Sequence, residues 1–533
     1  MFKRIQSVLL VSVVVMLFGC YSSEEEFRSE RIKKAKKHYE EISQKIIPDG
    51  KVFTLPECIK LALEQNLDLK VFALREAVNR ERKTAAMLGM LPELNVSMDA
   101  NHRSNEAGSS SENIKTGAET FAPSKSSEKD EVDFKIDMAL STLDFGLAYF
   151  NSSQAHDRMI LARQQHRRAA QNLKLDVVKT YLKVAAAQDA IETTETLIKK
   201  CHDIQDTITE LSKSKRISPM RLLDERKRFI RLEKRLMTYR RSYNNACIEL
   251  RSLMGYFPIN KIRVNTSALK EITVVDIPNI DTLEKIALVE RPELYQLDIQ
   301  VNITVTEARK TILMMFPNVR AFADFNNSSN KFLYHQSWWE IGIKAAYNLL
   351  KLPEQVAKYY SIETEADELA MRTLALSIGV MSQVRIAQAN LDDVKERYEL
   401  DNKVYQAYAD HLKVALQNYQ SGGALSKLEI NRLELETAET EIDRLLALSN
   451  YYLSYYRMLN TVGVTSLDKD TVDTIMAEIQ RSDRLKEEKQ EQMARASKII
   501  KDTSDSFNGV DVKDNTTTET ERARLDKLLA DAE

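Results

Sequence analysis

Two segments near the start of the chain alternate apolar and polar residues with a period of two. The alternation runs from Leu94 to Ala100 and, more regularly, from Val132 to Ser141. A period of two places one kind of side chain on each face of a strand. Each segment has about the ten residues that a tilted strand needs to cross a bilayer. We therefore predict two strands with one face suited to lipid and one suited to water.

A second pair of alternating segments follows later in the chain. Val319–Phe325 is the poorer strand, because Phe322 falls on its polar side, and Trp339–Leu349 is regular. Trp338 and Trp339, the only tryptophans, open the last strand, where an interfacial aromatic girdle is expected. Any one of these strands would suit an amphipathic soluble hairpin equally well. Four strands in two matched pairs favour a membrane location.

Helical periods occupy the segments around the strands. Thr54-Leu-Pro-Glu57 predicts a capping box at the start of a helix, which we expect to run to about Met90 and to stop before Pro92. Between each pair of strands, the polar segments Asn105–Asp130 and Asn326–Gln336 have no apolar period and are expected to be loops.

Much longer helices are predicted after the second strand. From Leu143 to about Ser212, apolar residues recur at spacings of three and four, which indicates coiled-coil-like packing over a length on the order of 100 Å. Ser218-Pro219 begins a return helix that ends near Gly255, with proline at its first position. Only 13 Gly and 10 Pro in 533 residues agree with such uninterrupted elements.

The two halves of the chain repeat the same order of elements. Each half has a helix, a strand, a loop, a strand, a very long helix, a tight turn and a long helix. Equivalent positions are separated by 225 residues (Asn66 and Arg291, Pro92 and Pro317), by 207 (Gly146 and Pro353) and by 208 (Ser218 and Ser426, Gly255 and Gly463). The chain is therefore predicted to be a tandem duplication.

The amino terminus has the pattern of an export signal. Lys3 and Arg4 precede an apolar run from Ile5 to Phe18, and Gly19-Cys20 follows. This arrangement is typical of a bacterial lipoprotein signal that ends at a lipidated Cys20. The alternative is an ordinary secretory signal with an incidental cysteine. Both interpretations predict that the protein leaves the cytoplasm.

Composition excludes several other functions. The 77 basic and 79 acidic residues nearly balance, which gives no argument for nucleic-acid binding. Cys58, Cys201 and Cys247 have no metal-ligand spacing, so neither a disulfide framework nor a metal site is expected. The pair Cys201 and His202, like His156 and His166, is more simply explained by surface or packing roles. No phosphate loop, nucleophile elbow or zinc-protease helix is present, so we expect no enzyme and no cofactor.

Several motifs together resemble the TolC-like family of bacterial outer-membrane efflux proteins. The resemblance covers about Val52–Val464. It is carried by Thr54-Leu-Pro-Glu-Cys-Ile-Lys-Leu-Ala-Leu-Glu-Gln-Asn-Leu-Asp-Leu, Leu91-Pro92, Leu143-Asp-Phe-Gly and Tyr419-Gln-Ser-Gly-Gly-Ala-Leu-Ser-Lys-Leu-Glu. Two departures are Lys215-Arg216, where the family usually has glycine, and Lys351-Leu352-Pro353, which replaces the second Asp-Phe-Gly-like turn.

The resemblance implies a mainly α protein with a membrane β-barrel portion. Three copies would build one barrel of about twelve strands, continued by an α-helical tunnel. Such a homotrimer would lie in the outer membrane, anchored by lipid, and would be the passive exit duct of a tripartite efflux or type I secretion system. Its partners would be a periplasmic adaptor and an inner-membrane pump. The alternative from another class is a soluble periplasmic coiled-coil scaffold or adaptor without a pore.

The resemblance also divides the chain into parts. These are a lipoprotein signal peptide (1–19), a lipid anchor and charged spacer (20–51), a first efflux repeat (52–259), a connector (260–280), a second efflux repeat (281–464) and a charged C-terminal extension (465–533). The extension is expected to contain one helix to about Ile500 and then a polar tail.

The turns between the long helices are expected to face the adaptor. They contain Lys215, Arg216, Ile217 and Ser218 in the first repeat, and Gly422, Gly423, Ala424 and Leu425 in the second. In the family, acids just after the second turn line the constriction, and this position is Glu429 here. The remaining aperture candidates are Arg432, one turn later, and Arg221 and Asp224, which repeat symmetry places opposite. Because these charges are spaced by three, they would also suit ordinary surface pairs.

Overall fold

The computed structural model describes residues 23–48, 50–213, 218–259, 262–267, 269, 277–422, 427–482 and 484–485. The chain divides into two units, Met1–Thr465 and Ser466–Glu533. In the second unit, residues 469–482 are helical. Cys20, the tip residues 215–217 and 423–425, and the end of the extension lie outside the described residues.

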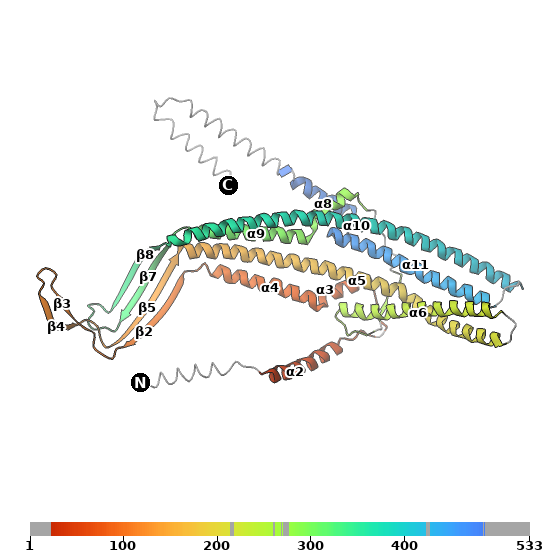
Figure 1. Ribbon diagram of the computed structural model, residues 1–533, viewed down its shortest axis with the longest axis horizontal. Coiled ribbons are helices and arrows are strands. Elements are labelled where there is room, and N and C mark those ends of the chain that lie inside the picture. The colour runs from red at the N-terminus through yellow and green to blue at the C-terminus, as the bar shows by residue number, and fades with distance from the viewer. Residues whose placement is uncertain are drawn as a thin grey trace, which may run out of the picture. The chain divides into compact units, whose positions relative to one another are not determined.

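The two repeats have matching elements (Figure 1). The first contains α3 (Leu55–Gln65), α4 (Leu67–Leu88), β2 (Glu93–His102), β5 (Asp130–Ser141), α5 (Thr142–Lys213) and α6 (Pro219–Leu253). The second contains α8 (Ile280–Glu290), α9 (Pro292–Leu313), β7 (Asn318–Ser328), β8 (Ser337–Ala346), η1 (Leu349–Lys351), α10 (Leu352–Gln420) and α11 (Lys427–Val462). Outside this pattern are α2 (Glu24–Ser43), β1 (Val52–Phe53), β3 (Gly108–Glu112), β4 (Glu119–Lys125) and β6 (Arg263–Val264).

The four predicted strands form one antiparallel sheet in the order β2-β5-β7-β8. The duplication is therefore visible in the sheet, because β2 and β5 come from the first repeat and β7 and β8 from the second. The last strand ends at Ala346, earlier than the predicted Leu349, since Leu349 already belongs to η1.

The very long helices α5 (72 residues) and α10 (69 residues) connect the sheet to the opposite end of the first unit. Near the sheet, α4 packs on α5, and α9 packs between α5 and α10. Farther away, α6 packs on α5, and α11 packs between α5 and α10. Figure 1 shows α11 continuing the course of α9 along α10. Among the described helices, none combines the length and apolar character needed to cross a bilayer.

The first predicted helix is wrong in one respect, because it is interrupted at Asn66. The capping box of Thr54 and Glu57 is present, but Asn66 has extended backbone angles, so α3 ends and α4 begins there. The Asn66 Oδ1 atom accepts from the Leu69 backbone, and its Nδ2 donates to the Leu253 carbonyl. The break is stabilised by a contact with α6. Helical periodicity in the sequence cannot predict this contact, because the two residues are far apart in the chain.

Two small sheets were not predicted. The segment 105–130, expected to be a loop, contains the β3–β4 hairpin, whose polar strands lack the apolar alternation of a half-buried strand. β1 and β6 form a parallel pair of two residues each. Tyr181 of α5 secures this pair, since its hydroxyl donates to the carbonyl oxygens of Phe53 (3.3 Å) and Asn265 (2.9 Å).

The main apolar core surrounds the β1–β6 pair. It includes the fully buried Phe53, Tyr181 and Leu250, and the free cysteines Cys58 and Cys247. Burial raises the pKa of the Cys58 thiol to about 12 and that of Cys247 to about 11. Both thiols are therefore protonated packing groups.

Candidate functional site

One face of the four-stranded sheet is continuously apolar. The register aligns Val96, Ile136, Phe325 and Trp339 in one row across all four strands. Val96 and Trp339 are exposed, Ile136 and Phe325 are half-buried, and on the same face Ile341 is 82% exposed. An exposed apolar face of this kind indicates a surface that meets lipid or another protein.

The opposite face of the sheet is charged. Lys135 of β5 pairs with Asp324 of β7 at 2.7 Å, and Arg320 of β7 pairs with Asp137 of β5 at 2.8 Å. These ion pairs cross between the two repeats. The sheet therefore has one wet and one apolar face, as the period of two predicts.

The two tryptophans lie on opposite faces of β8. Trp339 stands on the apolar face, with its ring centroid 5.1 Å from that of Phe325. Trp338 is registered with Asn326 and therefore shares the polar face. Of the predicted pair, only Trp339 has the orientation of a lipid-facing interfacial residue.

The outer strands β2 and β8 each pair with only one strand among the described residues. Their free edges present unpaired backbone N–H and C=O groups. Such edges are not tolerated inside a bilayer, because no water is there to satisfy them. A sheet of this kind in lipid would need further strands to pair with its two edges.

At the far end of the long helices, the described residues reach the base of the predicted tips. Gly422 ends the α10 side with a φ of +79°, which suits its predicted role in a tight turn. Asp224 is exposed and Glu429 half-buried. Arg432 lies 4.0 Å from Glu436, one turn along α11. The side chain of Arg221 lies outside the described residues.

A cluster of charged residues between α6 and α11 was missed by the sequence analysis. Arg235 contacts both Glu439 and Asp443 at 2.5 Å, and the Tyr239 hydroxyl donates to Asp443 at 2.7 Å. Burial raises the pKa of Glu439 despite the attraction of Arg235. The only sequence signal was the spacing of four between Arg235 and Tyr239 on α6 and between Glu439 and Asp443 on α11, which places each pair on one face of its helix. The partners are some 200 residues apart in the sequence, so their contact could not be inferred.

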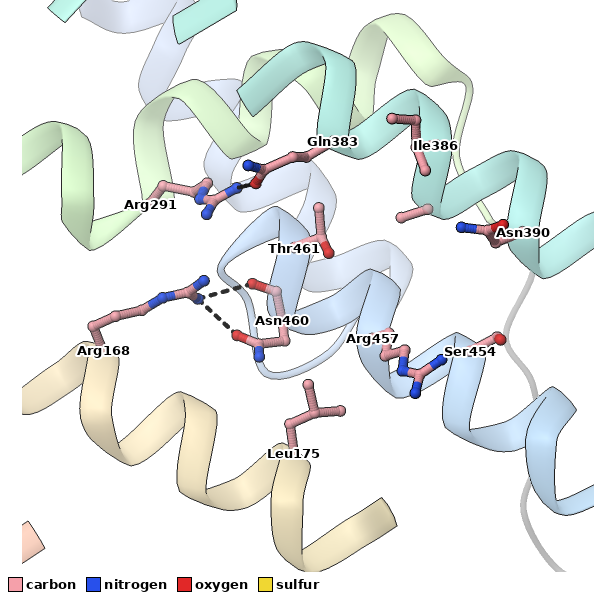
Figure 2. Close-up of a pocket in the computed structure, with 11 residues that line it drawn as sticks. Arg168, Leu175, Arg291, Gln383, Ile386, Asn390, Ser454, Arg457, Asn460 and Thr461 are labelled. Atoms are coloured by element: carbon pink, nitrogen blue, oxygen red, sulfur yellow. Dashed lines mark hydrogen bonds between the residues drawn. The ribbon is translucent and has the colours of Figure 1, made fainter. Parts of the chain in front are cut away.

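A cavity of about 400 Å³ lies where α9 and α11 meet between α5 and α10. Figure 2 shows the side chains around it, which come from all four helices. Arg168 of α5 donates to the carbonyl and amide oxygens of Asn460, and Arg291 at the start of α9 donates to Gln383 of α10 (Figure 2). No pattern in the sequence predicted this cavity.

The chain is similar to proteins of known structure and to one family model. Residues 58–256 match the model of the outer membrane efflux protein family. A comparison with curated proteins finds no match.

Solved outer-membrane channels share the fold at low sequence identity. The open state of the MtrE channel of Neisseria gonorrhoeae is 16% identical, with 78% of this chain and 91% of MtrE covered and a TM-score of 0.59. The CmeC channel of Campylobacter jejuni is 14% identical, with 80% of this chain and 88% of CmeC covered and a TM-score of 0.59. A membrane protein from Pseudomonas aeruginosa is 14% identical, with 79% and 94% covered and a TM-score of 0.61.

These likenesses confirm the predicted fold class, in which a mainly α chain carries a membrane β portion. The match over residues 58–256 and the shared fold together identify an outer membrane efflux protein domain in this chain, as the motifs of the sequence predicted.

Proposed function

We propose that the protein is the outer-membrane exit duct of a tripartite efflux or type I secretion system. The observation that carries this proposal is the sheet β2-β5-β7-β8, which has one exposed apolar face, one charged face and two free edges. A soluble scaffold or adaptor has no use for an exposed apolar sheet, which would favour its aggregation. No observation favours that alternative.

The free edges support a homotrimer. Three protomers would contribute about twelve strands and close one barrel, so that no edge remains in lipid. The charged face would then line water and the apolar face would meet lipid. The β3–β4 hairpin and the segment 326–336 lie at the end of the sheet away from the long helices, and we assign them to the cell exterior.

The ends of the α5–α6 and α10–α11 helix pairs would dock a periplasmic adaptor, which in turn would bind an inner-membrane pump. Residues 215–218 and 422–425 form these tips in the proposal, and Glu429, Arg432, Arg221 and Asp224 surround the aperture. Lipid attached to Cys20 would anchor the amino terminus in the outer membrane. In support of such a tether, the exposed helix α2 follows residue 20 in the sequence and precedes the first repeat.

Paired substitutions on β8 test the membrane assignment. Ile341→Arg places a charge on the apolar face, at a cost of about 2–4 kcal/mol near the bilayer midplane. Glu340→Arg makes a similar change on the adjacent, water-lining position and serves as the control. We expect Glu340→Arg and the unchanged protein to sediment with the outer membrane as heat-modifiable trimers, and Ile341→Arg to lose them. A soluble monomer in all three cases would refute the proposal.

A further inference from the structure

The cavity between α5, α9, α10 and α11 has an unusual concentration of positive charge. Its lining contains Arg168, Arg291 and Arg457, and no acidic residue among the described residues that line it. Glu293 pairs with the half-buried Arg168 at 2.7 Å and with the buried Arg291 at 3.1 Å. One carboxylate therefore offsets only one of the three guanidinium charges.

Two of these arginines, Arg168 and Arg291, are held in place by neighbouring side chains. Arg291 is only 5% exposed, and its guanidinium is fixed by Glu293 and by the Gln383 side chain. Arg168 is fixed by Glu293 and Asn460. Burial and the neighbouring Arg291 lower the pKa of Arg168, although the charge of Glu293 opposes this. Bringing an anion into the cavity would relieve this repulsion.

Arg457 differs from the other two arginines, because it is exposed and makes no ion pair with any described residue. Figure 2 shows it on α11 beside Ser454, which lines the same cavity and is 6% exposed. The hydroxyl of Ser454 and the amide of Asn390 add neutral donors. Arg457 is thus the charge that remains available to a ligand.

Apolar side chains complete the lining. Leu175, Ile386 and Ala387 contribute carbon surface beside the arginines. A pocket with positive charge on one side and carbon surface on the other fits an organic anion, such as an aromatic carboxylate, better than a free inorganic ion.

Two contacts of α10 show on which side of that helix the cavity lies. On α10, Arg385 binds Glu284 of α8 at 2.6 Å, whereas Gln383, two residues earlier, lines the cavity. Two residues correspond to about 200° around a helix, so Glu284 of α8 and the cavity residue Gln383 lie on opposite sides of α10. If three copies close into a tunnel, the side of α10 away from Glu284 is the one that can face its interior.

We propose that this cavity is a binding station for organic anions on the inner wall of the tunnel, repeated once in each protomer. This proposal rests on the proposed function for its place on the cargo path. It names a cargo class: small molecules that carry a carboxylate or a similar oxyanion beside an apolar body.

Binding of benzoate to the purified full-length protein tests the site, with saturation-transfer NMR as the readout and inorganic phosphate as the second probe. Arg457→Gln should weaken benzoate binding about fivefold or more, because it removes the one guanidinium that no other residue holds. Arg457→Lys should retain binding, since it keeps the charge. Lys285→Gln removes an exposed charge from α8, on the other face of the wall, and should leave binding unchanged.

Equal benzoate affinity in the unchanged protein and in Arg457→Gln would overturn the proposal. Phosphate binding as tight as that of benzoate would overturn the assignment to organic anions. The assay needs only folded protein, so its failure is distinguishable from that of the proposed function. Loss of outer-membrane trimers with benzoate binding intact contradicts only the duct, whereas trimers without Arg457-dependent binding contradict only the anion site.

Discussion

Phe322 shows how a single residue can disturb a sequence pattern and still fit the structure. It falls on the charged face of β7, where the alternation predicts a polar side chain. Gly342 on β8 leaves the space for its ring, since a Cβ there would lie 2.6 Å from the Phe322 Cζ. The Lys344 amine lies 4.2 Å from the ring centroid and covers it from water. The irregular position is thus a local packing arrangement and not a break in the strand.

The stability of the helices around the cavity depends on the charge state of Glu293. Burial alone would raise its pKa, but hydrogen bonds from Arg291 and the charge of Arg168 outweigh burial, and the pKa is lowered. A carboxyl group with a lowered pKa stabilises the fold above its ordinary pKa of about 4.3, and this contribution is lost as the pH falls through the lowered value.

Glu293→Gln should therefore lower the thermal unfolding temperature at neutral pH, because it leaves the buried Arg291 and the half-buried Arg168 without their shared carboxylate. The difference from the unchanged protein should shrink as the pH falls below about 4. Circular dichroism melts across a pH series measure this. Glu368→Gln, at an exposed position of α10, is the control and should show no difference at any pH. A pH-independent loss for Glu293→Gln would contradict this account.

Among the elements, the long helices and the membrane strands were the most predictable. Their periods depend only on residues that are close in the sequence, as in the alternation of β5 or the apolar spacing of α5. The breaks at Asn66 and Arg291 were found only as matching positions of a repeat. Their cause is tertiary: each break receives the end of another helix, α6 at Asn66 and α11 at Arg291.

The candidate site was predicted less completely than the fold. The apolar and charged faces of the sheet follow from the alternation, and Trp339 lies where a lipid-facing residue is expected. By contrast, the contacts of Arg235 with Glu439 and Asp443 join residues that are far apart in the sequence. No local pattern in the sequence pairs residues at such a separation.

Gly463 is the point at which α11 closes against the α8–α9 break. Its φ is +90°, and a Cβ would lie 3.1 Å from the Glu290 carbonyl oxygen. Gly463→Ala should destabilise the protein by roughly 1–2 kcal/mol or more, because a side chain both strains the left-handed backbone and crowds this carbonyl. Chemical denaturation followed by circular dichroism measures the change.

Gly379 in the middle of α10 provides a matched control, since no atom lies within 4 Å of a Cβ placed there. Gly379→Ala should be neutral or stabilise the helix by about 0.5–1 kcal/mol. Equal effects of the two substitutions would show that the α8–α9 junction does not depend on the backbone of Gly463.

At the scale of the whole molecule, the protomer has the parts of a duct but cannot form one alone. Among the described residues, its sheet has two free edges, and α8 and the β1–β6 pair pack against the long helices of its wall. In the proposed assembly, three copies would pair these edges in a closed barrel, and their long helices would enclose a tunnel. Pore formation is therefore the central property of the proposed duct.

Electrical recording across a planar lipid bilayer tests that claim most directly. Purified full-length protein should produce discrete, stable conductance steps, since a closed barrel holds a continuous aqueous path. Ile341→Arg, which charges the lipid face, should produce few or no steps, and Glu340→Arg should behave like the unchanged protein. If folded, trimeric protein inserts into the bilayer but carries no current under any applied voltage, the account of the molecule as a duct is contradicted.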